Sequence, residues 1–546
     1  MIAIIEAMRA GLFRKDNILR NVIAGTIVAV ITLPLSMAFA IASGAKPEAG
    51  IYTSIVAVVI VSLFGGSRVQ ITGPTSAFVG VLLGVSSKYG PEGLQIATVM
   101  AGVMMLLLGI CKCGQMIKFI PEQVIAGFTA GIGVNMLIGQ VPNFFGLKCG
   151  HLPINICDKL RTLGQAFGSL DLPTTYFAIA SLLIMVIAPN SFLRKIPAPL
   201  LALVFGITMQ AAFRFESVAT IGSVFGGLSN KLPSFTPTST LSFEVIQKLL
   251  APAFAIAILG AIESLLCAVI ADSLAGTKHS SNQELIGHGI ANMISPMFGG
   301  IATTGSIART IASVKMGGNC PIAGLVSALT LCLILCLLSP LAKFVPLSSL
   351  AAILFVVAFR MVNHRHVYNL LVYAPRSDAI ILILTFGLTL FCGIVTAVNV
   401  GVVLSALLLM NRMAGSSHID RINKRKYLDY DFSQVSDGIA IYSISGPIFF
   451  GMIDKFSGTF SSVGKDERII ILRMFDVPFI DATGLENLHL IISSFKKRGI
   501  FIMLSETNKA VMEKLKRSYM KKNPVIKMAD KSIVEILDIA NKMLNE

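Results

Sequence analysis

Charged residues are scarce in this sequence. Only 14% of its 546 residues are charged, whereas 54% are hydrophobic and the mean hydropathy is +0.77. This composition excludes an ordinary soluble protein, in which about a quarter of the residues are charged. The sequence therefore predicts a membrane protein with many spans.

Motifs for catalysis and metal binding are also lacking. The seven histidines show no ligand-like clustering, and the sequence contains no P-loop, nucleophile elbow or zinc motif. Most of the nine cysteines lie in apolar runs, where a small buried hydrophobe is the usual role. Cys111 and Cys113 form a CxC pair without partner ligands. We therefore expect neither an enzyme nor a bound cofactor, apart from a sodium ion considered below.

The net charge of +16 has a topological explanation, so it does not indicate a nucleic-acid partner. Lys and Arg accumulate in the cytoplasmic loops of membrane proteins. If the N-terminus is cytoplasmic, ten Lys and Arg residues fall in short inside loops and three in short outside loops. The inside residues are Arg68, Lys112, Lys118, Arg194, Lys195, Lys278, Lys315, Arg360, Arg365 and Arg376, and the outside ones are Lys46, Lys88 and Lys343. An even number of spans then predicts a cytoplasmic C-terminus as well.

Fourteen apolar segments are bounded by charges, prolines or glycines. They cover residues 20–43, 49–64, 74–86, 94–111, 121–140, 174–190, 197–213, 251–272, 283–298, 305–317, 321–339, 346–360, 378–393 and 396–412. Several are shorter than the roughly 20 residues that a full span needs. The two shortest, 74–86 and 305–317, open on the polar stretches QITGPTSAF and GIATTGSIART.

The C-terminal part of the chain has a different composition. The stretches GIAIYSI, RIIILRMF and IFIMLSE read as buried strands, and ATGLENLHLIISSFKKRG reads as an amphipathic helix that ends at Gly499. No apolar run there approaches spanning length, so we expect a small cytoplasmic α/β domain. The predicted organisation is a cytoplasmic segment at 1–19, a transmembrane domain at 20–413, a linker at 414–430 and the α/β domain at 431–546.

The two polar stretches are copies of one motif. Each follows FGG, at Phe64 to Gly66 and at Phe298 to Gly300, and each continues into Thr-Gly, at an offset of 232 to 234 residues. Seven predicted spans separate the copies, so the copies enter the membrane from opposite faces. This arrangement is typical of inverted repeats, in which discontinuous helices meet near the bilayer midplane and build a substrate site.

A half-helix that begins inside the membrane exposes the N–H groups of its first turn and the positive end of its dipole. Two such ends make an anion site without a fixed cation. Pro74 suits the first helical position, because its missing N–H is not needed there. Thr75, Ser76 and Ser306 could then add hydroxyl donors.

Two charged side chains are predicted inside the membrane. Glu263 lies deep in its span, and it is interpreted either as a cation or proton site beside the anion or as a neutral strut between helices. Arg309 lies one turn after Ser306; it compensates Glu263, raises the potential around the anion, or extends to the cytoplasmic interface. Asp272 and Glu284, at span ends, are expected to be interfacial.

In these residues and in the motifs around them, the chain resembles the sulfate permease (SulP) family. The resemblance covers nearly the whole chain and is carried, in order, by LPLSMAFAIASGAKPEAGIYTSI, FGGSRVQITGPTSAF, ESLLCAVIAD, SNQELIGHGIANMISPMFGGIATTGSIARTIASVKMGG and VPFIDATGL. It implies an all-α membrane domain of fourteen spans in two inverted repeats of seven, a homodimer, and a C-terminal STAS domain. Spans 1 to 4 and 8 to 11 would form a core, and spans 5 to 7 and 12 to 14 a gate.

The resemblance also implies the positions of the site. The anion would lie between Thr75, Ser76, Ala77 and Phe78 and the segment Gly305, Ser306 and Ile307, with Phe39 lining the pocket. Glu263 matches an acid that is tied to sodium or proton coupling in bacterial relatives, and Thr304 is a further candidate for the coupling ion. Leu35 departs from the Gln of many animal members, which weakens any inference from their selectivity.

Thr483 in the α/β domain matches a phosphorylated Ser of the anti-sigma-factor antagonists that share the STAS fold. A Thr at this helix start also serves as an ordinary cap, so the two interpretations, a regulatory residue or a cap, both stay open.

We expect a secondary active importer of sulfate, bicarbonate or a C4-dicarboxylate in a bacterial inner membrane, coupled to sodium or protons. The alternatives are an uncoupled anion channel or exchanger, and a membrane signalling protein whose STAS domain binds a cytoplasmic partner. In the long outside loop, Cys149 and Cys157 form either a disulfide or two free thiols.

Overall fold

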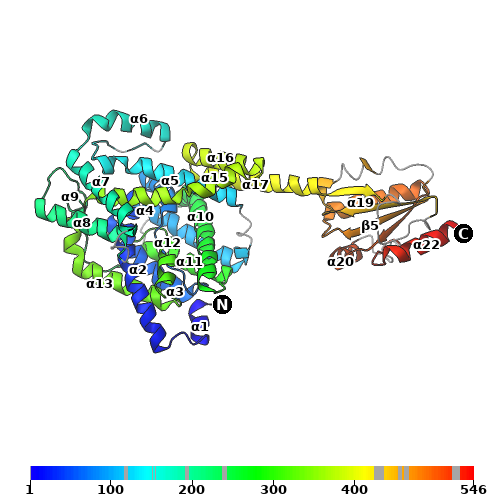
Figure 1. Cartoon of the computed structure of the whole chain (residues 1–546), viewed down its shortest axis with the longest axis horizontal. Helices are drawn as coiled ribbons and strands as arrows, with labels where there is room; N and C mark the ends of the chain where they lie inside the picture. The colour runs from blue at the N-terminus through cyan, green and yellow to red at the C-terminus, as the bar shows by residue number, and fades with distance from the viewer. Residues whose placement is uncertain are drawn as a thin grey trace. The chain divides into compact units, whose positions relative to one another are not determined.

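The structure, a computed structural model, divides into two compact units, Met1–Val403 and Leu404–Glu546, which are described separately. It describes residues 2–115, 121–150, 152, 153, 155–190, 196–235, 243–422, 436–452, 458, 459, 467–518, 525 and 529–545. Figure 1 shows a helical first unit and a second unit built on a sheet, in agreement with the predicted fold class.

Helices make up almost all of the first unit (Figure 1). Those of the first half are α1 (Ala3–Arg9), α2 (Lys15–Ala42), α3 (Pro47–Phe64), α4 (Ser76–Ile110), α5 (Glu122–Phe145), α6 (Ile156–Ala166), α7 (Leu172–Ile187), α8 (Ala198–Phe213) and α9 (Ile221–Phe225). Those of the second half are α10 (Phe243–Ala275), α11 (Ser281–Ile294), α12 (Ile307–Lys315), α13 (Ile322–Ala342), α14 (Leu347–Met361), α15 (His364–Val372), α16 (Arg376–Phe391) and α17 (Ile394–Ser416).

Every predicted apolar segment falls on one of these helices, and the last of them, α17, continues into the second unit. Segments 74–86 and 94–111 share α4, which bends where Gly90 adopts φ 70° and ψ −173° ahead of Pro91. Among the described residues, seven helices are long and apolar enough to cross a membrane, or eight if the bent pair Ile156–Ser169 and Leu172–Ile187 forms one span. Fourteen spans therefore remain a prediction.

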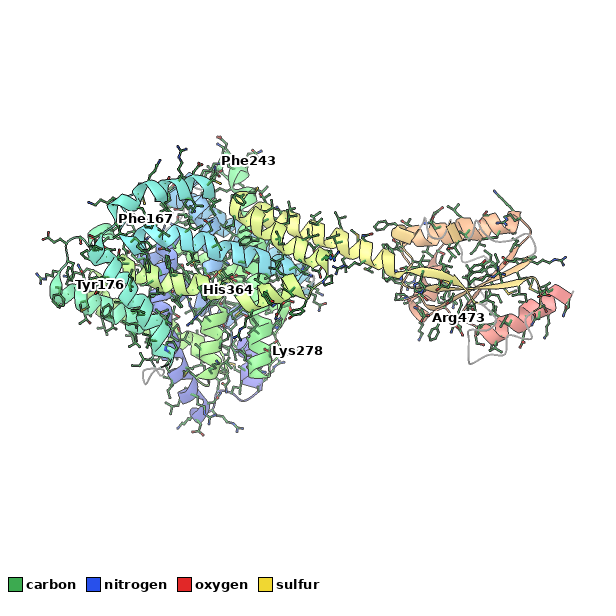
Figure 2. The ribbon with its side chains drawn as sticks, turned by 45° about the horizontal axis from the view of Figure 1, so that its top comes forward. Phe167, Tyr176, Phe243, Lys278, His364 and Arg473 are labelled. Carbon is green, nitrogen blue, oxygen red and sulfur yellow. The ribbon has the colours of Figure 1, made fainter. Side chains whose placement is uncertain are left out.

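The helices of the first unit pack in two groups. α4 packs against α10 and α11, α3 against α11, and α2 against α3 and α13, whereas α5 packs against α14 and α16 and α7 packs against α8 and α14. These groups correspond to the expected core and gate. Large apolar side chains also point outward: Tyr176 and Phe243, labelled in Figure 2, are 80% and 82% exposed, as lipid-facing residues are.

The second unit is a four-stranded sheet covered by helices. The strands β3 (His418–Arg421), β4 (Ile439–Ser445), β5 (Ile469–Asp476) and β6 (Phe501–Ser505) lie in that order, with β3 antiparallel and the others parallel. The helices are α19 (Ala482–Lys497), α20 (Lys509–Arg517) and α22 (Ile533–Asn545).

Both faces of this sheet are buried. Along β4, Ala440, Tyr442 and Ile444 join the apolar cluster of α19 and α20, and Ile439 and Ile441 join that of α22. A continuous apolar run is the pattern of such a strand. β3 lies within the segment that the sequence predicts as a linker, 414–430; residues 423–430 of that segment lie outside the described residues.

Candidate functional site

Two short strands pair with each other inside the core group, and the segments that contain them, residues 66–75 and 300–306, are called the crossing segments. β1 (Thr72–Gly73) pairs antiparallel with β2 (Thr304–Gly305), so that Thr72 lies opposite Gly305 and Gly73 opposite Thr304. All four residues are buried. The pairing brings the two Thr-Gly copies side by side from opposite directions, which is the arrangement that an inverted repeat with discontinuous helices requires.

A helix begins shortly after each strand. Thr75 is the N-cap of α4, which starts at Ser76, and Ser306 is the N-cap of α12, which starts at Ile307. Neither N-cap side chain accepts a hydrogen bond from the first turn of its helix. The first-turn N–H groups and the positive dipole ends of the two helices are thus left for another acceptor, such as an anion.

Arg309 of α12 is fully buried, so the expectation that it extends to the cytoplasmic interface is wrong. Its Nη2 donates to the carbonyl of Pro74 at 3.0 Å and to Ser36 Oγ at 3.3 Å, while Nε and Nη1 have no described partner. Among the described side chains, it forms no ion pair with Glu263. Its guanidinium therefore places a positive charge next to the residue that precedes the N-cap of α4.

Pro74 precedes the N-cap and is not the first helical residue, so that prediction is also wrong. Its carbonyl instead accepts a hydrogen bond from the Arg309 guanidinium. The neighbouring Gly73 has φ 156°, and a methyl group there would overlap Arg309 Nη1. Glycine is therefore required by the close approach of the guanidinium.

Glu263 lies on α10, next to the start of α4. Thr75 Oγ1 donates to its Oε2 at 3.3 Å, and the Glu263 side chain keeps some exposure. The hydroxyl that could cap α4 thus contacts the carboxylate instead. One hydrogen bond therefore connects a predicted anion residue with the predicted coupling acid.

Thr304 and its neighbours join α10 to the second crossing strand. The Thr304 hydroxyl lies 2.7 Å from Ser264 Oγ and donates to the carbonyl of Gly260 at 3.1 Å, and Gly305 N donates to Ser264 Oγ at 3.4 Å. Two consecutive residues of α10 therefore contact the two segments: Glu263 contacts Thr75 in the first, and Ser264 contacts Thr304 and Gly305 in the second. The segments before both half-helices thus contact the same helix, α10.

The remaining predicted site residues divide into two sets. Ser76 and Ile307 keep partial exposure, whereas Ala77 and Phe78 are buried and the Phe78 ring packs towards Gly260. Phe39 is also buried, in an apolar cluster that includes Val79 of α4.

Glu284 is not interfacial, contrary to the prediction. It is fully buried on α11, and its Oε2 accepts from the N–H groups of Gly66 at 2.6 Å and Ser67 at 2.8 Å. Its Oε1 lies 3.1 Å from His288 Nε2, which lies 3.2 Å from Gln70 Nε2. Sequence reasoning missed these residues, although Gln70 stands in the first polar stretch and Glu284 and His288 are four residues apart.

Side chains from helices of both repeats hold the two crossing segments. Asn292 of α11 accepts from Thr303 N and donates to Thr303 O, both at 2.8 Å. Thr53 of α3 accepts from Ile301 N at 2.7 Å. Buried backbone groups of the crossings are therefore paired with side chains, as a dry interior demands.

In the second unit, the cap prediction for Thr483 is wrong. Asp481 is the N-cap of α19 and accepts from Gly484 N at 2.6 Å, and the Thr483 side chain is exposed. In the first unit, Cys149 and Cys157 are free thiols and are not joined to each other.

Comparison with known proteins gives two family matches. The model of the sulfate permease family matches residues 18–385, and that of the STAS domain matches residues 433–531. The chain is 39% identical over 494 residues to the putative sulfate transporter YvdB of Bacillus subtilis, with 90% of this chain and 91% of the relative covered. It is 30% identical over 531 residues to the bicarbonate transporter BicA of Picosynechococcus, with 92% and 91% covered.

Solved structures agree with the fold. The inward-facing murine anion transporter Slc26a9 matches with a TM-score of 0.87 at 18% identity, covering 99% of this chain and 94% of that one. The transmembrane domain of a cyanobacterial BicA matches with a TM-score of 0.63 at 26% identity, covering 72% of this chain and 98% of that one. The relatives are transporters, which confirms the prediction that the chain is not an enzyme.

Proposed function

This chain belongs to the sulfate permease family of anion transporters, and we propose that it carries a small anion together with a cation held at Glu263. The observation that supports coupling is the hydrogen bond of 3.3 Å from Thr75 Oγ1 to Glu263 Oε2. Thr75 is the N-cap of a half-helix whose free N–H groups suit an anion, and Glu263 is the carboxylate beside it.

The anion lies, in this proposal, between the starts of α4 and α12. The N–H groups that follow Thr75 and Ser306 donate to it, the hydroxyls of Ser76 and Ser306 add donors, and Arg309 contributes positive potential from behind. Backbone donors bind a charged oxygen without a permanent counter-ion, so the anion can also leave.

The cation, sodium or a proton, binds the Glu263 carboxylate and is cargo of the transport cycle. An ionised Glu263 repels a nearby anion, since two unit charges about 4 Å apart interact by about 4 kcal/mol at an effective dielectric constant of about 20. It also occupies the Thr75 hydroxyl. A bound cation removes the repulsion and frees the hydroxyl for the anion, so the two ligands favour each other.

Sulfate or bicarbonate is the substrate that we propose. The names of the two relatives support this choice, one a putative sulfate transporter and the other a bicarbonate transporter. A C4-dicarboxylate stays among the anions to be tested. We further propose a homodimer in a bacterial plasma membrane with both termini in the cytoplasm, where the exposed Thr483 of the STAS domain would be a regulatory position.

Uptake into proteoliposomes tests the proposal. Labelled sulfate, bicarbonate and succinate are offered separately, with a sodium gradient or a pH gradient imposed alone. We expect concentrative uptake of one anion that depends on one gradient. Flux that only follows the anion's own gradient would indicate an uncoupled channel.

Glu263→Gln isolates the coupling step. The substitution keeps the shape of the side chain but removes its charge. Gradient-driven uptake should therefore fall at least about tenfold, which corresponds to a loss of about 1.4 kcal/mol in cation binding. Equilibrium anion binding should survive and lose its dependence on the cation. Asp272→Asn, on the same helix but bonded to His279, is the matched control and should transport normally. Undiminished concentrative uptake by Glu263→Gln would refute the coupling role.

A further inference from the structure

Three polar residues form a buried row along one face of α11. Glu284, His288 and Asn292 are spaced by four, which places them on the same side of a helix, and all three have no exposed surface. α11 packs against α3, α4 and α10. The row therefore faces the interior of the core group, where no water replaces a lost hydrogen bond.

The row contacts both crossing segments at three places. Glu284 binds Gly66 N and Ser67 N, before β1. Asn292 binds both backbone groups of Thr303, directly before β2. Between them, His288 contacts Gln70, whose amide lies where a methyl group on Gly305 would be. One helix thus determines where both strands enter their pairing.

α11 itself is held rigidly against α4. A methyl group on Gly102 would lie 2.6 Å from Met293 N, and one on Gly289 would lie 2.6 Å from Leu106 N. These distances mean that the two backbones touch, as at small-residue crossings in membranes. The row cannot shift by itself, so the lengths of its side chains set the positions of the segments that they hold.

We propose that Glu284 and Asn292 are positioning residues that set the separation between the starts of α4 and α12 and thereby select the size of the transported anion. Thr75 follows β1 by two residues and Ser306 follows β2 by one, so a displaced strand moves its N-cap with it. The inference rests on the anion site proposed above, because the residues of α11 do not contact the anion and act only through the segments that form that site.

Two length variants test the proposal with the hydrogen-bonding chemistry kept. Glu284→Asp shortens the first contact by one methylene, and Asn292→Gln lengthens the second. Competition of unlabelled chloride, bicarbonate, sulfate and succinate against the transported label gives the ratio of inhibition constants between small and large anions. We expect this ratio to change by about tenfold in each variant, since a misplacement of about 1 Å costs up to about a hundredfold.

A merely structural role predicts a different result. It would lower the melting temperature and the uptake of all anions in proportion, with the ratio unchanged; that outcome overturns the proposal. Glu284→Gln keeps the length and should keep the ratio, so it is the length control; if Glu284→Asp does not fold, Asn292→Gln carries the test. Asp272→Asn is the matched control, because that carboxylate also accepts a backbone N–H, from His279 at 2.8 Å, but contacts neither crossing.

The test separates this inference from the proposed site. If Ser306→Leu abolishes uptake while the α11 variants keep the wild-type ratio, only the role of α11 is wrong. If Ser306→Leu leaves saturable uptake intact, the anion site itself is wrong, whatever the α11 variants do.

Discussion

Gly73→Ala probes the contact that places the start of α4. A methyl group at this position would overlap Arg309 Nη1 and lie 3.2 Å from its Cζ and 3.3 Å from Ser54 Oγ. The guanidinium must therefore move away from Pro74 O and Ser36 Oγ, which it now contacts at 3.0 and 3.3 Å. Because Arg309 is fully buried, no solvent can replace these acceptors.

The expected cost follows from these contacts. Overpacking of a buried site costs about 1–3 kcal/mol, and loss of one hydrogen bond to a charged group costs about 1.5–3 kcal/mol. Together they amount to about 2.5–6 kcal/mol, so we expect a clear loss of thermal stability. If half of the lower cost, about 1.25 kcal/mol, destabilises the conformation that binds the anion, the population of that conformation and hence uptake fall by nearly tenfold, since about 1.4 kcal/mol is a factor of ten.

Uptake in proteoliposomes and the melting temperature in detergent are the assays. Gly84→Ala, on α4, is the control, because nothing lies within 4 Å of a methyl group there and Ala suits a helix interior better than Gly by about 0.5–1 kcal/mol. It should transport like the wild type. Wild-type uptake and melting temperature in Gly73→Ala would refute the close approach of Arg309 and its role in placing α4.

Three further predictions concern other parts of the chain. Ser306→Leu should abolish uptake with expression unchanged, because the larger side chain crowds the start of α12; retained saturable uptake contradicts the two-half-helix site. Truncation after Tyr427 should change the rate or dimer assembly but not which anion competes, and a changed competition profile contradicts it. Partial burial raises the pKa of the Cys149 thiol, so maleimide labelling of Cys149 at pH 7.5 should be slow and accelerate as pH rises; labelling as fast as at the exposed Cys157 contradicts this.

Predictions from sequence succeeded where the cause is local. Apolar runs form helices in the first unit because each run carries its own pattern, and β4, β5 and β6 of the second unit were found for the same reason, whereas β3 was predicted as linker. The copied Thr-Gly motif predicted two helices that begin inside the core group, and both do. Glycine and proline act on their own backbone, so their effects can be read without knowledge of distant partners.

Prediction failed where a partner lies far away in the chain. Glu284 looked interfacial because it stands near a span end, yet its backbone partner Gly66 is 218 residues away. Arg309 donates to the carbonyl of Pro74, at a separation of 235 residues, and its burial there excludes the interfacial position that was one of its three expected roles. At Thr483 the error was shorter in range, since Asp481 two positions earlier takes the cap.

The sequence alone therefore indicated the membrane character and the two copies of the polar motif, because composition, periodicity and repetition are properties of the chain. Only the tertiary structure decided that β1 pairs with β2, that Thr75 donates to Glu263 rather than capping α4, and that α11 holds both crossings. A buried polar group must find a partner wherever the fold offers one, and its choice depends on which distant backbone groups are left without bonds when the helices pack.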